Sequence, residues 1–175
     1  MNLTAIKGVK EIAIKHFLDS LACSRALVLQ DQPSLLDVGS GAGFPGLPLK
    51  ILHPQLRLTL LEPNAKKTSF LRHVVGSLHL GGAAVVSKNL RDFVRAATTP
   101  GKFSHVITRA VSAAQVLPFS AALLEKGGRV ILCRTKPLDI DPAQHGLKVS
   151  DELDYELPYG FGHRILTVLQ PTAVS

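Results

Sequence analysis

Residues 35 to 46 read Leu35-Leu36-Asp37-Val38-Gly39-Ser40-Gly41-Ala42-Gly43-Phe44-Pro45-Gly46. An apolar run that ends in an acid and continues into alternate glycines is typical of a β-strand that leads into a ligand-binding loop. Glycine at positions 39, 41 and 43 removes the side chains that would keep a ligand away from the main chain, and it tolerates the positive φ angles that such a turn needs. The stretch therefore predicts a site for a nucleoside-containing cofactor at the end of a strand.

Two cofactor classes fit this loop. Gly41, Gly43 and Gly46 match the G-x-G-x-x-G pattern of dinucleotide-binding proteins. Asp37, followed by glycine at 39, 41 and 43, matches the D/E-x-G-x-G-x-G pattern of S-adenosylmethionine (SAM) methyltransferases. A carboxylate at this place repels a pyrophosphate but attracts the ammonium group, or through water the methionine part, of a zwitterionic cofactor. We therefore expect SAM rather than NAD, and a glycine-rich turn without a ligand is the remaining alternative.

The residues around the loop predict a β-α-β unit. Strands are expected at 34–38 and 57–61, and the helix between them, 47–52, ends before His53-Pro54. The second strand is followed by Glu62, 21 positions after Gly41, where such folds place an acid for ribose hydroxyls. Glu62 is thus expected at the cofactor, with a solvated strand-end carboxylate as the alternative.

Strands and helices alternate along the rest of the chain. A leading helix at about 9–29 is indicated by apolar stripes at Val9, Ala13, Phe17, Leu21 and at Ile14, Leu18, Ala22. Further helices are expected at 65–78 with Asn64 as N-cap, at 90–97, and at 112–125 ended by Gly127-Gly128; strands are expected at 83–87, 102–108 and 129–133. Residues 138–146 are expected to be the least regular segment of the chain.

The end of the chain changes character. Segments 147–157 and 163–169 read as two strands joined by the turn 158–162, with no helix between them, so they must be antiparallel. The chain is expected to be one domain, residues 1–175, with the three-layer Rossmann-like α/β fold of class I SAM methyltransferases. Its sheet is expected to have seven strands, mostly parallel, with a C-terminal antiparallel hairpin.

The bulk composition limits the function classes. The formal net charge of +7 and the isoelectric point near 9.7 favour a polyanionic partner, and several cations follow the predicted strands, among them Lys66, Lys67, Arg72, Lys88, Arg91, Arg95, Arg134 and Lys136. Cys23 and Cys133 read as small buried thiols in a reducing compartment, and the histidines form no metal-binding motif. No apolar run approaches a membrane span. We expect a soluble cytoplasmic monomer without metal.

Four blocks of sequence, in order along the chain, carry a resemblance to a known family. They are Asn2-Leu3-Thr4-Ala5-Ile6 with His16-Phe17-Leu18-Asp19-Ser20; Leu36 to Gly46; Leu60-Leu61-Glu62 with Lys66-Lys67 and Phe70-Leu71; and Thr108-Arg109-Ala110. These blocks resemble the bacterial small-subunit ribosomal RNA guanine-N7 methyltransferases of the RsmG (GidB) type. The first block and the Gly-Ala-Gly-Phe-Pro-Gly-Leu-Pro sequence are the more specific parts, because many methyltransferases share the glycines.

The resemblance implies a set of site residues. SAM contacts are implied for Asp37, Gly39, Ser40, Gly41, Ala42, Gly43 and Phe44, for Glu62 at the ribose, for Leu90 and Arg91 near the adenine, and for Arg109. Glu62 replaces the usual Asp, and Arg91 replaces a usual Glu, so only a main-chain contact carries over at Arg91. Arg109 is also implied at the point where methyl and acceptor meet, with a purely structural pairing to Asp37 or Glu62 as its alternative.

The implied reaction is methyl transfer from SAM to N7 of a guanine in a decoding-region loop of 16S ribosomal RNA, so the implied partner is that RNA or the small ribosomal subunit. N7 already has a lone pair in the ring plane, so no general base is needed, and Arg109 would hold the cofactor carboxylate, a phosphate or the acceptor loop. Phe44 or Phe119 would stack on the base, with core packing as the alternative.

The chain departs from the family pattern at three places: fewer residues precede Asn2, Arg134-Thr135 replaces Lys-Gly, and the basic C-terminal tail is absent. The shortened ends would remove surface that contacts RNA. Two other functions therefore stay open: a methyltransferase for a small molecule or protein, and a relative that binds SAM or RNA without transferring methyl.

Overall fold

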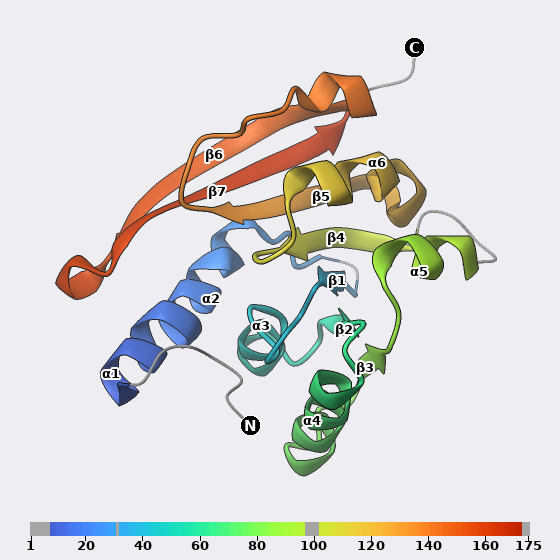
Figure 1. The fold of residues 1–175 in the computed structure, drawn as a ribbon. Helices are drawn as coiled ribbons and strands as arrows, with labels where there is room; N and C mark the ends of the chain where they lie inside the picture. Colours follow the sequence, from blue (N-terminus) through green and yellow to red (C-terminus); the bar gives the residue numbers. More distant parts are fainter. Residues whose placement is uncertain (1–7, 31, 97–101, 173–175) are drawn as a thin grey trace.

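The computed structural model describes residues 8–30, 32–96 and 102–172, which build a single seven-stranded sheet (Figure 1). The block Asn2 to Ile6 lies outside these residues. The strands are β1 (Ser34–Val38), β2 (Arg57–Leu61), β3 (Ala83–Val86), β4 (Phe103–Thr108), β5 (Leu124–Arg134), β6 (Leu147–Leu157) and β7 (Gly162–Pro171). Their order is β3-β2-β1-β4-β5-β7-β6. The first five are parallel and β7 runs antiparallel to both β5 and β6, which confirms the predicted fold class.

Helices cover both faces of the sheet (Figure 1). The leading segment is continuous and consists of α1 (Val9–Ile12), the π-helix η1 (Ala13–Leu18), α2 (Asp19–Ala22) and the 3₁₀-helix η2 (Cys23–Ala26). The crossover helices are α3 (Gly46–Leu52), α4 (Ala65–Ser77), α5 (Leu90–Ala96) and α6 (Ala113–Leu123), and short 3₁₀ turns η3 (Pro142–His145) and η4 (Pro158–Gly160) flank β6. Asn64 caps α4 as predicted, because its side chain accepts from the N–H groups of Lys66 and Lys67.

The core consists of two apolar clusters, one on each face. Side chains alternate along every central strand, so Leu36 and Leu61 join the cluster under α5 and α6. Their neighbours Leu35 and Leu60 join the cluster under η2, α3 and α4. This burial on both faces is why β1 reads as a continuous apolar run.

The leading helix differs from its prediction. It ends at Ala26 rather than near residue 29, because Leu27 has an extended backbone. Of the predicted apolar stripes only Ile14 is buried: Phe17 is 47% and Leu21 37% exposed, whereas Asp19 is 5% exposed. The π-helical stretch widens one turn and so rotates the residues that follow around the helix axis.

The helix predicted at 112–125 is longer than the helix in the structure. It ends at Leu123, and β5 begins at Leu124 and includes the two glycines that were expected to cap the helix. Gly127 has φ +80°, and a Cβ on Gly128 would lie 2.9 Å from the carbonyl oxygen of Phe103. The glycine pair therefore allows β5 to approach β4 closely where the register shifts, and it does not end the helix.

A buried histidine ties the leading segment to the sheet. Nε2 of His105 on β4 accepts from the N–H of Val28 at 3.0 Å, and its Nδ1 lies 2.9 Å from Oγ of Ser104. Burial lowers the pKa of His105 to about 4, with a smaller contribution from Arg129. Burial therefore favours the neutral imidazole ring of His105 in the folded protein.

This burial predicts a pH-dependent contribution to stability. His105 has its pKa lowered on folding, from 6.5 to about 4, so its contribution is complete above 6.5 and is lost as the pH falls toward 4. Relative to His105→Gln, the wild type should lose about 2 kcal/mol of unfolding free energy between pH 7 and pH 5. The difference between the two proteins is the proper measure, because buried Asp37, with its pKa raised to about 7, contributes in the opposite direction. Urea unfolding at both pH values tests this, and equal pH dependence in the two proteins would contradict it.

Candidate functional site

The loop between β1 and α3 has the backbone that its sequence predicted. Gly39, Gly41 and Gly43 have φ angles of +73°, +58° and +96°. The N–H groups of Gly39 and Ser40 donate to the carbonyl of Leu61, at 2.8 and 3.2 Å, so the loop begins by bonding to the end of β2. The three glycines thus hold positive-φ conformations that L-residues rarely adopt.

The three glycines serve different purposes. A Cβ on Gly39 would lie 2.4 Å from Val111 Cγ2, and one on Gly43 would lie 2.2 Å from Leu47 Cδ1, so packing excludes side chains there. A Cβ on Gly41 would meet nothing closer than the Gly39 carbonyl oxygen at 3.8 Å. Gly41 therefore leaves open space beside the main chain, as a cofactor-binding loop requires.

Two carboxylates hold the loop in shape. Glu62, 5% exposed, accepts from the N–H of Gly41 at 2.9 Å and from the N–H of Asn64 at 3.0 Å. Asp37, 1% exposed, accepts from the N–H of Gly46 at 2.9 Å at the start of α3. Burial raises the pKa of Asp37 to about 7, against the smaller lowering effect of the Gly46 hydrogen bond. The Asp37 carboxylate thus points into the protein toward α3, and its predicted contact with a cofactor ammonium group stays a prediction.

A cavity of about 630 Å³ opens where the cofactor was predicted. Gly39, Leu90 and Arg91 line it, together with Phe119 and Val111. Leu90 is buried and Arg91 is exposed, so the first presents an apolar wall and the second a cation at the rim. Apolar walls beside a glycine loop fit the base of a nucleoside.

The remaining loop residues do not line this cavity. Ser40 is buried and donates from Oγ to the carbonyl of Asp37 at 2.9 Å, whereas Ala42 is half-buried. Phe44 stacks on His16, with ring centroids 4.8 Å apart and an interplanar angle of 18°, and Phe17 meets it edge-on at 5.1 Å. One ring face of Phe44 is therefore already covered by His16, and stacking of a base on Phe44 or Phe119 stays a prediction.

A second cavity, of about 680 Å³, lies on the other side of Val111, which lines both. It is bounded by the ends of β4 and β5, by β7 and by the leading helix. Its charged lining consists of Lys15, Arg109, Arg134, Lys136 and Arg164 against Asp19 and Asp139. Five cations against two carboxylates make this cavity suitable for a ligand that carries negative charge.

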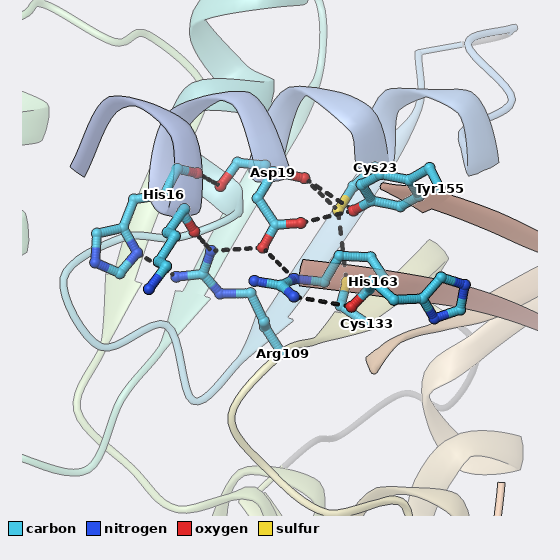
Figure 2. A network of polar contacts seen from close by, with 10 residues as sticks. His16, Asp19, Cys23, Arg109, Cys133, Tyr155 and His163 are labelled. Atoms are coloured by element: carbon cyan, nitrogen blue, oxygen red, sulfur yellow. Dashed lines mark hydrogen bonds and ion pairs between the residues drawn. The ribbon is translucent and has the colours of Figure 1, made fainter. Parts of the chain in front are cut away.

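Arg109, at the end of β4, contacts the leading helix (Figure 2). Its guanidinium donates to the carbonyl of Lys15 at 3.3 Å, lies 3.1 Å from Nδ1 of His16, and lies 3.7 Å from Oδ2 of Asp19. It also lies 5.5 Å from the ring centroid of Phe44. The structural alternative, a pairing with Asp37 or Glu62, is wrong, because Arg109 pairs with Asp19.

Asp19 is the site residue that sequence reasoning missed. Its Oδ1 accepts from the Tyr155 hydroxyl at 2.7 Å, and its Oδ2 accepts from Nε of Arg164 at 3.3 Å (Figure 2). An acid among apolar helix residues was the available signal, although nothing in the sequence indicated the partners. Nearby, Cys23 and Cys133 place their sulfurs 3.5 Å apart as free thiols, and their mutual hydrogen bond, followed by burial, raises the pKa of Cys133.

The described residues give two further limits. Among them, no three His, Cys, Asp or Glu side chains gather as a metal-binding group would require. Within the same ranges, no helix has the length and apolar character needed to cross a bilayer.

Comparison with known proteins finds one family repeatedly. The family model described as rRNA small subunit methyltransferase G matches residues 1–153. Proteins named ribosomal RNA small subunit methyltransferase G are similar to the chain. The one from Pelotomaculum thermopropionicum is 47% identical over 67% of this chain and 49% of its own length. That from Carboxydothermus hydrogenoformans is 38% identical over 95% of this chain and 74% of its own. The chain thus spans between about half and three quarters of these relatives.

Solved structures share the fold at low sequence identity. The precorrin-6y C5,15-methyltransferase of Geobacter metallireducens has a TM-score of 0.66 at 15% identity, covering 87% of each chain. A SAM-dependent methyltransferase of Aquifex aeolicus has a TM-score of 0.65 at 13% identity, covering 90% of this chain and 92% of its own. These likenesses show that the architecture is that of SAM-dependent methyltransferases.

The loop geometry predicts that single added methyl groups have separable effects. Gly41→Ala should weaken SAM binding at least tenfold, because its Cβ enters the open space, while stability falls by only about 1 kcal/mol for the positive φ. Gly43→Ala should destabilise the fold more, because its Cβ collides with Leu47. Gly76→Ala in α4, whose Cβ meets nothing within 4 Å, is the control. Calorimetric SAM titration and thermal unfolding measure both effects, and unchanged SAM affinity in Gly41→Ala would remove the loop assignment.

Proposed function

Since the chain belongs to the rRNA small subunit methyltransferase G family, we propose that it transfers the methyl group of SAM to N7 of a guanine in small-subunit ribosomal RNA. The observation that carries the proposal is the meeting of two cavities at Val111. One opens beside the glycine loop, and the other has a basic lining and lies at the end of β4. A nucleoside cofactor in the first and an RNA base in the second would meet at this wall.

The loop residues supply the cofactor site in this proposal. Gly41 leaves the backbone accessible, and each oxygen of Glu62 accepts one backbone N–H and keeps a second lone pair for a ribose hydroxyl. Leu90 and Phe119 form the walls for the adenine. When bound, SAM supplies a methyl group on a positively charged sulfur. The family resemblance and the methyltransferase fold support SAM as the cofactor.

The acceptor chemistry needs placement more than proton transfer. Guanine N7 has an in-plane lone pair and loses no proton on methylation, so the chain needs no general base there. Holding N7, the methyl carbon and the sulfur in one line converts an encounter between molecules into a reaction within one complex. Arg109, at the cavity wall with its guanidinium fixed by the leading helix, holds an anionic group of the cofactor or the RNA in place.

The charge of the protein suits an RNA partner. The net charge of +7 and the five cations that line the acceptor cavity favour a polyanion, and binding should weaken as salt rises. We propose 16S ribosomal RNA, free or within the small ribosomal subunit, as substrate for a monomeric protein in the cytoplasm. The names of the relatives, which specify ribosomal RNA of the small subunit, support this choice of substrate.

Labelled methyl transfer tests this function. Protein and SAM with a tritiated methyl group are incubated with small subunits from a strain that lacks the modification, with free 16S RNA and with buffer alone. We expect label in the RNA at one guanine, detected as N7 methylation by chain cleavage after borohydride reduction and aniline. Transfer to protein or small molecules without RNA would support the first alternative. SAM binding without transfer would support the second, a binding protein.

A further inference from the structure

We propose that Asp19 is a positioning residue for methyl transfer: it fixes the guanidinium of Arg109 at the wall of the acceptor cavity and compensates its charge. The inference rests on the proposed function, which assigns the acceptor to this cavity. Asp19 lines the cavity and lies on α2 in the leading helix, far from the glycine loop in sequence. It lies in the block His16 to Ser20 that carries the family resemblance, and that resemblance implied no role for it.

The contacts of Asp19 use both carboxylate oxygens. Oδ1 accepts from the Tyr155 hydroxyl at 2.7 Å, and Oδ2 lies 3.3 Å from Nε of Arg164 and 3.7 Å from Nη1 of Arg109 (Figure 2). Only 5% of Asp19 is exposed. A buried carboxylate is retained in a fold only when such partners offset its desolvation, and here two of the partners are guanidinium groups that line the same cavity.

Asp19 is the negatively charged partner of the Arg109 guanidinium. The hydrogen-bond partners of Arg109 are the Lys15 carbonyl and Nδ1 of His16, whereas Asp19 forms an ion pair with it at 3.7 Å and is its sole carboxylate partner within 4.0 Å in the described ranges. Removing the charge of Asp19 would leave Arg109 uncompensated beside the reacting atoms.

That charge matters because methyl transfer moves positive charge. The sulfur starts as a cation, and the positive charge passes to the guanine ring as the new N7–methyl bond forms and the sulfur–methyl bond breaks. An uncompensated guanidinium at the acceptor cavity opposes the arrival of this charge, whereas a carboxylate paired with it reduces the opposition. Asp19 therefore allows an arginine to hold an anionic group at the cavity without hindering the chemistry.

Asp19→Asn tests this inference, because it keeps the shape of the side chain and removes its charge. With tritiated SAM and small subunits that lack the modification, we expect kcat to fall at least tenfold while KM for SAM changes less than threefold. In an Arg109→Met background, the same change should lower the single-turnover rate less than threefold further, because the Arg109 charge that Asp19 compensates is gone and Arg164 is present in both backgrounds.

Matched variants separate this role from simple support of the fold. Asp154 is an exposed carboxylate on β6 that pairs with His163 on β7 at 2.9 Å. Asp154→Asn removes this charge from the hairpin without touching the cavity, and should leave kcat unchanged. Tyr155→Phe removes a hydrogen bond to Asp19 but not its charge, so it should lower the melting temperature and keep kcat within threefold. If Tyr155→Phe lowers kcat as much as Asp19→Asn, or if Asp19→Asn acts equally in both Arg109 backgrounds, the inference is overturned. A wild type that transfers no methyl would instead contradict the proposed function.

Discussion

The site depends on a loop whose backbone is held open by acids from two neighbouring strands. The Asp37 carboxyl group accepts a hydrogen bond from the N–H of Gly46, and the Glu62 carboxylate accepts one from the N–H of Gly41. These bonds help to offset the conformational entropy that the glycine backbone loses when it is held in one conformation. Because β1 and β2 are paired residue by residue, with Asp37 opposite Leu60 and Val38 opposite Leu61, the two carboxylates are held at the same end of the sheet, beside the predicted cofactor cavity.

The second half of the site is built by parts of the chain that lie far from that loop. The leading helix supplies His16 and Asp19, Arg109 follows the end of β4, and the C-terminal hairpin supplies Arg164. They line a cavity whose charged residues are mostly cations, next to the cavity predicted for the cofactor. The same pattern explains the π-helical turn: Ala13–Leu18 carries the His16 ring onto Phe44 while the next residues turn Asp19 toward the sheet.

The sequence predicted the part of the molecule that local patterns control. Alternating strands and helices, the loop glycines with positive φ, the Asn64 cap and the terminal hairpin were all anticipated, because each follows from periodicity, capping or turn chemistry within a few residues. The buried face of the leading helix was not, since the π-helical stretch shifts the phase of the pattern and Asp19 is buried by partners up to 145 residues away. Asp37 was expected to face the cofactor, and its buried position follows from the start of α3, which the motif alone does not describe.

The strand order separates the two halves of the site along the chain. The glycine loop and the five parallel strands are complete by Arg134, whereas β7 lies between β5 and β6, so β6 has no neighbour in the described sheet without it. The guanidinium of Arg164, which bonds to Asp19, comes from that inserted strand. The second cavity therefore depends on the C-terminal hairpin, and the glycine loop does not.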